Sequence, residues 1–436
     1  MNSDDSSANA DLQRFDDYMK MLSGALGHAD REVPFRSYSM GLILPGERKS
    51  VEPMSAQIDP RNVRKTHQSL HHFVATSAWS DEAVIARVRE AVFPVMQARE
   101  AIQAWIIDDT GIPKKGKHSV GVSHQYCGQL GKQANCQVAV SLSIANTFAS
   151  LPIAYRLYMP DSWFDDEHAD RRKACGVPSD VQFFTKPQIA LQQISEAVSA
   201  GIPQGVVVAD AAYGNTTSFR EGITALGVTY ALSVQATTSV WRPGEAPLKP
   251  PKRRSKRGPA PIRLKRTAKR HPISVEDLAY ELPESAFKQI TWREGTNKTL
   301  RSRFAAIRVR PANGDTSRSS PREYEWLLIE WPKDEEAPTK YWLSTLDESM
   351  SIDDLVKASM LRWRIERDYQ DLKQELGLGQ YEGRSWRGFH HHATLCIAAY
   401  GFLLINQGGF SPFGRPRVRL AQPAIPADFR PRGSPS

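Results

Sequence analysis

Cysteine is scarce in this chain of 436 residues, and none of its four cysteines belongs to a C-x-x-C pair. Neither a disulfide framework nor a cysteine-based structural zinc site is therefore expected. No apolar run approaches the ~18 residues that a membrane-spanning helix requires. The polar, acidic N-terminal stretch MNSDDSSANADLQRF fits neither a signal peptide nor a transit peptide. Together these absences predict a protein of a reducing cytoplasm.

Several catalytic motifs are missing as well. The sequence has no P-loop and no dinucleotide-binding glycine fingerprint, and no G-x-S-x-G supports a Ser/His/Asp hydrolase. What is present is an ordinary globular composition, with 40% hydrophobic and 24% charged residues. The length exceeds that of one ordinary domain, which predicts two or three globular parts.

Positive charge is concentrated in one segment. The formal net charge is +9, from 57 basic against 48 acidic residues, and residues 246–275 alone hold eleven basic residues and no acid. Without this proline-rich segment the balance is 46 against 48, or −2. Such a segment cannot bury apolar surface and repels itself. We therefore predict an exposed basic loop that contacts the phosphates of DNA.

The chain divides by pattern into five parts. Residues 1–95 show helical spacing and predict an N-terminal helical DNA-binding module, with Ser80 as a helix N-cap. Strand and helix patterns then alternate, which is typical of an α/β protein. The predicted parts after the module are a catalytic core in two pieces, 96–230 and 346–407, a β-rich insertion at 231–345, and a flexible tail at 408–436.

Three acids lie where a metal site would need them. Asp109 ends the strand AWIIDD, Asp210 ends the strand GVVVAD, and Glu366 lies inside a helix predicted from about Ile352 to Leu376. Carboxylates beyond the ends of neighbouring strands can share divalent cations, and oxygen ligands favour Mg²⁺ or Mn²⁺. An aspartate at a strand end also often caps a helix. Asp108 and Asp109 point to opposite faces of their strand, so at most one of them binds a metal directly, and the other is a supporting or turn residue.

The helix around Glu366 combines charge with a buried stripe. Arg362 and Lys373 stand four residues before and seven after Glu366, so all three fall within roughly 40° of one another on a helix. The neighbouring stripe of Leu361, Ile365, Leu372 and Leu376 is expected to face the core. The pattern indicates two cations that hold a substrate phosphate beside a metal on Glu366, although an ordinary surface helix also uses such pairs.

These motifs resemble those of a known family. The segment LRWRIERDYQDLKQELGL resembles the third-acid helix of bacterial insertion-sequence transposases of the DDE type, which carry a Tyr–Arg–Glu–Lys signature. Arg362, Glu366 and Lys373 match its spacing, whereas Ser359 stands at the Tyr position. IDDTGIPKKG and VVVADAAYG resemble the first-acid and second-acid strands, and the first of these favours Asp109. The resemblance covers roughly residues 35–405.

The resemblance implies a fold and a reaction. It implies an α/β chain whose RNase H-like mixed sheet is flanked by helices, with a β-rich insertion between the second and third acids. It implies a transposase that uses Mg²⁺ or Mn²⁺ on Asp109, Asp210 and Glu366 to cleave DNA and transfer strands. Arg362 and Lys373 would position phosphates. Lys114 and Lys115 follow Asp109 in a loop, where they would contact DNA phosphates or remain solvated.

The expected partners are the terminal inverted repeats of the element and its target DNA, with no membrane. Joining two ends implies at least a dimer on DNA, in a bacterial cytoplasm and on the nucleoid when bound. Two alternatives remain open, a metal-dependent endonuclease of the same fold without strand transfer and a non-catalytic DNA-binding derivative. The run His390, His391 and His392 resembles a metal cluster, but adjacent helical residues face different ways and seldom chelate together.

Overall fold

The computed structural model describes residues 3–250, 262–293 and 300–408, which form two compact units. Unit 1 comprises the described parts of Met1–Ala101, Asp109–Phe184 and Arg364–Ser436. Unit 2 comprises those of Ile102–Asp108 and Thr185–Trp363. The chain passes between the units four times, after residues 101, 108, 184 and 363.

Helices occupy the N-terminal part of unit 1, as the sequence predicts. Ser80 caps the last of them through its hydroxyl oxygen, which accepts a hydrogen bond from the Ala83 amide at 3.1 Å, and Asp81 follows in the first turn, where a negative charge favours the helix dipole. The helices are α1 (Ser3–Ser23), α2 (Glu32–Ile43), α3 (Val51–Ile58), α4 (Val63–Ala75) and α5 (Asp81–Gln97).

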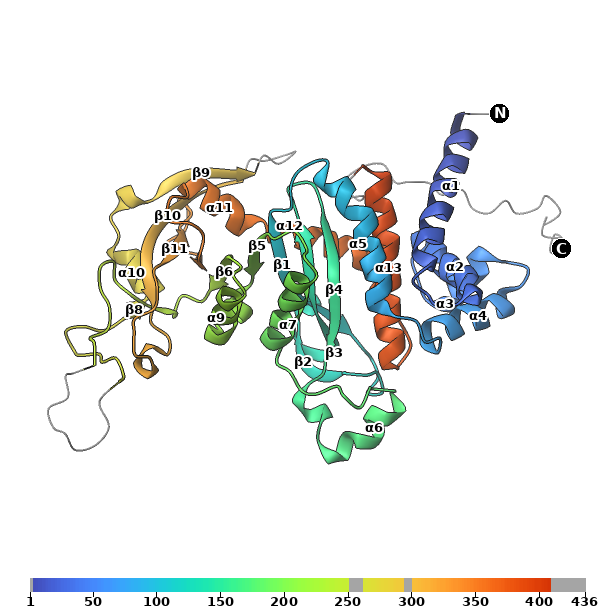
Figure 1. Ribbon diagram of the computed structural model, residues 1–436, viewed down its shortest axis with the longest axis horizontal. Coiled ribbons are helices and arrows are strands. Elements are labelled where there is room, and N and C mark those ends of the chain that lie inside the picture. The colour runs from blue at the N-terminus through green and yellow to red at the C-terminus, as the bar shows by residue number, and fades with distance from the viewer. Residues whose placement is uncertain (1–2, 251–261, 294–299, 409–436) are drawn as a thin grey trace, which may run out of the picture. The chain divides into compact units, whose positions relative to one another are not determined.

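The core of unit 1 is built around the helix α13 (Trp386–Asn406). This helix is buried on nearly all sides and packs against α2, α4, α5 and the strand β4, with α5 alongside it in Figure 1. The ring of Phe402 meets Phe15 of α1 edge-on at 5.1 Å. The Tyr18 hydroxyl donates to the Ala398 carbonyl at 3.1 Å. The N-terminal helices are therefore held by residues near the other end of the chain.

The strands of unit 1 are long and antiparallel. β3 pairs with β2 on one side and with β4 on the other, with a bulge in its pairing to β4 at Leu142 and Ser143. β1 starts in unit 2 and ends in unit 1. The elements are β1 (Ala104–Pro113), β2 (Ser123–Cys127), β3 (Lys132–Ala145), β4 (Ser150–Tyr158) and the short helix α6 (Ala169–Ala174).

Unit 2 contains parallel strands that continue into an antiparallel sheet. The first half of β1 is parallel to β5, and β5 is parallel to β6. From β6 the sheet continues antiparallel through β12, β11 and β10, with β9 and β7 also paired to β10 and β8 paired to β7. The strands are β5 (Val206–Ala209), β6 (Tyr230–Val234), β7 (Ser239–Trp241), β8 (Ile273–Ser274), β9 (Lys288–Arg293), β10 (Leu300–Pro311), β11 (Glu325–Glu330) and β12 (Lys340–Ser344).

Helices accompany these strands. The parallel strands β5 and β6 are joined through the helices α8 and α9, because parallel neighbours need a crossover connection. In the antiparallel part, Val356 and Met360 of α11 pack on Ile290, Phe304 and Trp342. The helices are α7 (Lys186–Ser199), α8 (Ala211–Gly214), α9 (Thr217–Ala225), α10 (Val275–Glu281), α11 (Ile352–Met360) and α12 (Trp363–Glu375), which begins in unit 2 and ends in unit 1.

The strand order β4-β3-β1-β5-β6 forms the centre of an RNase H-like mixed sheet. The residues of β1 from Ala104 to Ile107 are all buried, as expected of a central strand covered on both faces. The predicted α/β class is confirmed, with N-terminal helices and additional strands between the second and third predicted acids. Within the described residues, no helix combines the length and apolar character needed to cross a bilayer.

The single long helix predicted from Ile352 to Leu376 is wrong. The structure has α11 and α12, separated by a turn at Leu361 and Arg362. The amide of Leu361 bonds to the Ala358 carbonyl at 3.3 Å, which tightens the end of α11. One turn earlier, the Ser359 hydroxyl donates to the Leu355 carbonyl at 2.8 Å, and such back-bonding bends helices. The predicted buried stripe is nevertheless confirmed, since Leu361, Ile365, Leu372 and Leu376 are all buried.

The basic segment 246–275 is only partly as predicted. Its centre, 251–261, lies outside the described residues. Its second half packs on unit 2, with Leu264 buried and its amide bonded to the Arg318 carbonyl at 2.9 Å. The Arg266 guanidinium bonds to the buried Asp315 carboxylate at 3.0 Å. The basic side chains of this half are exposed, as predicted. The expectation that the segment buries no apolar surface is wrong at Leu264, and the buried Asp315 supplies an acidic partner that the segment itself lacks.

Candidate active site

Asp210 stands at the carboxyl end of β5 and caps the helix that follows. Its carboxylate oxygen Oδ1 accepts a hydrogen bond from the Ala212 amide at 2.9 Å. This is the capping role that the sequence analysis left open as an alternative. One oxygen of the carboxylate takes this hydrogen bond, and the residue is partly exposed. Capping and metal binding are compatible, because a carboxylate offers about four lone-pair sites.

The pairing register of β1 and β5 determines which residue of β1 lies beside Asp210. Ile106 is the partner of Val208 in the parallel pair. Continued two residues further, the same register brings Asp108 level with Asp210, and alternation along the strand turns both side chains to one face. Asp109 then points to the other face of β1. Asp108 and Asp109 are both partly buried.

Asp108 is engaged by Arg362. The guanidinium nitrogen Nη2 lies 2.8 Å from Asp108 Oδ1, and the two side chains are 24% and 17% exposed. Arg362 lies in the turn before α12 rather than inside a long helix, and this turn lets it reach β1. The sequence analysis predicted a phosphate contact for Arg362 and did not foresee this pair. A charged, half-buried pair of this kind fixes Asp108 beside the end of β5.

We expect substitution of Arg362 by alanine to destabilise the fold by roughly 1–3 kcal/mol, since it leaves the Asp108 carboxylate without its cation in a partly buried place. In urea unfolding, Asp108→Asn combined with Arg362→Ala should cost about 1 kcal/mol less than the sum of the single changes. The exposed pair of Arg87 and Glu90 offers a control, where Arg87→Ala should cost under about 0.5 kcal/mol. Additive costs at Asp108 and Arg362 would contradict the pairing.

The third predicted acid lies on α12. Glu366 belongs to that helix, but its side chain lies outside the described part of the structure. Lys373 stands two turns further along and is half-buried. At the family's Tyr position, Ser359 is buried in α11, and its hydroxyl bonds within that helix. Ser359 therefore does not present a hydroxyl to a substrate phosphate as the family's tyrosine would.

The two predicted loop lysines differ in their surroundings. The Lys114 ammonium donates to the Tyr381 carbonyl at 2.6 Å, and burial lowers its pKa to about 8. Lys115 is exposed. Lys115 is therefore the side chain of the two that extends into solvent, whereas Lys114 ties the loop to the segment before α13.

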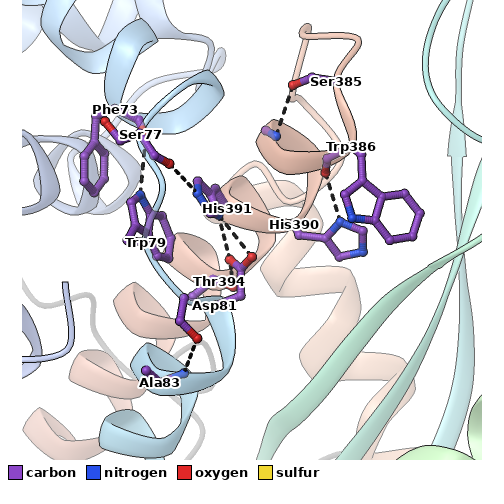
Figure 2. Close-up of polar contacts among 12 residues, drawn as sticks. Phe73, Ser77, Trp79, Asp81, Ala83, Ser385, Trp386, His390, His391 and Thr394 are labelled. Atoms are coloured by element: carbon purple, nitrogen blue, oxygen red, sulfur yellow. Dashed lines mark hydrogen bonds and ion pairs between the residues drawn. The ribbon is translucent and has the colours of Figure 1, made fainter. Parts of the chain in front are cut away.

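The three consecutive histidines of α13 have separate partners, and Figure 2 shows those of His390 and His391. His390 Nδ1 lies 2.9 Å from the Trp386 carbonyl. His391 stacks on Trp79 and lies 3.0 Å from Asp81. His392 lies 2.9 Å from both Tyr38 Oη and the Gly377 carbonyl, and burial lowers its pKa to about 4. They act in packing α13, and among the side chains that the structure describes no three His, Cys, Asp or Glu gather to hold a metal.

A metal site of carboxylates remains a prediction. The side chain of Glu366 is not among those described. Asp108 lies inside β1, two residues past its parallel pairing with β5, and Asp210 directly follows β5 within unit 2. The prediction that Asp109 ends its strand is wrong, because β1 continues to Pro113. Oxygen ligands of this kind suit Mg²⁺ or Mn²⁺ rather than zinc or iron. The donor chemistry at these strand ends therefore fits the cofactor that the resemblance implies.

One residue that supports Asp210 was not predicted from the sequence. Arg220 of α9 is 3% exposed, and its guanidinium donates to the Gly214 carbonyl at the end of α8. It also approaches the Thr217 hydroxyl at 3.4 Å. Arg220 thus anchors the short helix that Asp210 caps. No local pattern marks it, because an arginine in an amphipathic helix is normally solvated.

Comparison with known proteins agrees with this arrangement. The probable transposase for insertion sequence element IS701 of Microchaete diplosiphon is 29% identical over 203 residues. The similar segment covers 46% of this chain, and the chain spans about half (48%) the length of that relative. A family model described as DDE superfamily endonuclease matches residues 21–299, which contain both predicted strand-end acids. The chain therefore belongs to the DDE superfamily of endonucleases.

Proposed function

We propose that this protein is a transposase that cuts the DNA ends of the mobile element encoding it and joins them to target DNA. The observation that carries the proposal is the placement of acids just past the parallel pairing of two neighbouring strands, Asp108 and Asp109 within β1 and Asp210 after β5, in a chain of the DDE superfamily. The similarity to a probable insertion-sequence transposase supports it. Asp109 or Asp108, together with Asp210 and Glu366, would hold Mg²⁺ or Mn²⁺.

The proposed reaction has two phosphoryl-transfer steps. Water first attacks the phosphorus at the element's end, which breaks the bond to the 3′ oxygen and leaves a 3′-hydroxyl and a 5′-phosphate. That 3′-hydroxyl then attacks a phosphorus of the target, forms a new P–O bond and expels the target's 3′ oxygen. Two divalent cations on the acids would supply activation of the attacking oxygen and stabilisation of the departing one. The acids serve as ligands, so no bond forms between protein and DNA.

Other residues would bind and orient the DNA. Lys115 is exposed beside β1 and is suited to a phosphate contact. Lys373 stands on α12 seven residues after Glu366, so both start from one face of that helix. The guanidinium of Arg362 holds Asp108 in the free protein, and a phosphate contact by Arg362 would add to this contact or replace it. Synapsis of two ends would require two copies of the chain.

An end-joining assay tests the proposal. The protein is incubated with Mg²⁺, a labelled duplex carrying the element's terminal sequence, and a supercoiled target plasmid. Labelled plasmid is the expected product. Cut duplex without joining would identify an endonuclease that lacks strand transfer, and binding without cutting would identify a non-catalytic derivative. Asp210→Asn protein is the control, because asparagine preserves the cap of α8 and removes the carboxylate.

The basic segment leads to a salt-dependence prediction. Residues 251–261 carry five cations and no acid, and each phosphate they neutralise should steepen the log–log salt dependence of DNA binding by about 0.9. Deletion of 251–261 should therefore flatten that slope by up to about 4.5 units, while the preference for the terminal sequence should change little. Filter binding over a range of salt concentrations measures both. An unchanged slope would show that these residues touch no DNA.

A further inference from the structure

The helix α4 has one exposed face that carries no acid. Its inner side is fixed by Leu70, Phe73 and Val74, which are buried. The ring of Phe73 lies 6.2 Å from Phe35 of α2 and 5.4 Å from Trp79. The opposite arc, about 160° wide by helical geometry, is exposed and consists of Arg64, Lys65, Gln68, Ser69, His71 and His72, with Arg61 just before the helix.

The positive charge of this face is concentrated at the N-terminus of α4, where the helix dipole disfavours it. Arg64 and Lys65 lie in the first turn, where the helix dipole already places positive charge. The sequence has no acid between Asp59 and Asp81, and the Asp59 carboxylate is bonded to Asn62. Among the described residues, Arg61, Arg64 and Lys65 form no ion pair. The arrangement weakens the isolated helix slightly, and a polyanion on this face would remove that cost.

The surrounding helices hold α4 in a position to bind. α3 precedes it, the turn 59–62 joins the two, and α2 packs against both (Figure 1). Two helices joined by a short turn, with the second exposed, form the arrangement with which many proteins enter the major groove. From Arg64 to His72 the helix rises about 12 Å, comparable with the width of that groove.

We infer that the exposed face of α4 lies in the major groove of duplex DNA and reads bases of the element's ends. This inference rests on the proposed function, because the element's ends are the DNA concerned. Arginine pairs with guanine and glutamine with adenine through two hydrogen bonds each. A protein surface that contacts only the DNA phosphates needs positive charge alone. Arg64 and Gln68 are therefore the residues of α4 that would carry base recognition, and Arg61 and Lys65 would contact phosphates.

The test measures binding without catalysis. Affinities are determined in EDTA for a duplex carrying the element's terminal sequence and for a shuffled duplex of the same composition. Gln68→Ala and Arg64→Lys should each reduce the ratio of the two affinities by about tenfold or more, and both keep the charge of the face. Arg61→Ala should weaken binding to both duplexes alike. Arg87→Ala on α5, which removes an exposed cation outside this face, is the matched control.

The outcomes separate the two proposals. An unchanged ratio in Gln68→Ala and Arg64→Lys would overturn base reading by α4, whether binding to both duplexes falls equally or not at all. Wild-type protein without any preference would overturn both the inference and the proposed function. Wild-type protein that prefers the terminal duplex but never cuts it with Mg²⁺ would contradict the proposed function alone. Thermal melting of each variant confirms that the helix has folded.

Discussion

Substitution of Asp210 by asparagine is expected to slow cleavage of end DNA by at least about a thousandfold, or about 4 kcal/mol in the activation barrier, without loss of stability. Asparagine still accepts the Ala212 hydrogen bond that caps α8, but it cannot supply a negative ligand. Alanine at the same position should be equally inactive and about 1 kcal/mol less stable, because it also removes the cap. Single-turnover cleavage and urea unfolding measure the two effects separately.

The same assay decides the first acid. Asp109→Asn should be as inactive as Asp210→Asn if the motif identifies the first ligand, and Glu366→Gln should match both. Asp108→Asn should then retain cleavage but lose stability through its broken pair with Arg362. Inactive Asp108→Asn beside active Asp109→Asn would assign the ligand to Asp108. Wild-type rates in Asp210→Asn or Glu366→Gln would refute the metal site.

The second large effect is expected at Gly214, the last residue of α8. A Cβ atom there would overlap the Ser233 carbonyl oxygen of β6 and lie 3.2 Å from the Leu232 side chain. Backbone cannot move aside as a flexible side chain can, and the Arg220 guanidinium already bonds to the Gly214 carbonyl. We expect Gly214→Ala to cost about 3 kcal/mol or more, a loss of roughly 6–12 °C in melting temperature.

A matched glycine provides the control for this change. A Cβ at Gly128 would meet nothing within 4 Å, so Gly128→Ala should alter stability by under about 0.5 kcal/mol. Calorimetric melting of both variants makes the comparison. Equal melting temperatures would show that α8 can shift from β6 at little cost. In that case Asp210 would be held less rigidly than its neighbours suggest.

The secondary structure was predictable where the local pattern of apolar and polar residues matches the residues that are buried in the fold. The apolar runs before Asp108 and before Asp210 both form buried strand residues. Ser80 caps α5, as the sequence predicts. Strand pairing itself was not predictable, because register depends on residues distant in sequence. The family resemblance implied an RNase H-like mixed sheet, which the local pattern could not indicate.

The candidate site shows the same limit. Local spacing placed Arg362 and Glu366 in one helix, yet Arg362 lies in the turn between α11 and α12, where Ser359 bonds to the preceding turn of α11 and the guanidinium pairs with Asp108. The partner of Arg362 lies 254 residues away in sequence. Burial of Lys114 against the Tyr381 carbonyl is equally non-local. Sequence patterns identify residues that could bind or catalyse. Which residues they contact depends on tertiary packing between distant parts of the chain.

The position of α13 has a consequence for synthesis of the protein on the ribosome. About 290 residues separate the end of α5 from the start of α13, so the nascent helices α2, α4 and α5 wait roughly 15–60 s for α13 to pack against them at ordinary translation rates. During that interval the side chains of Phe15 and Val88, which α13 later covers, face solvent or chaperones. A message truncated before codon 386 would yield a chain that never closes unit 1, and cellular proteases would remove it.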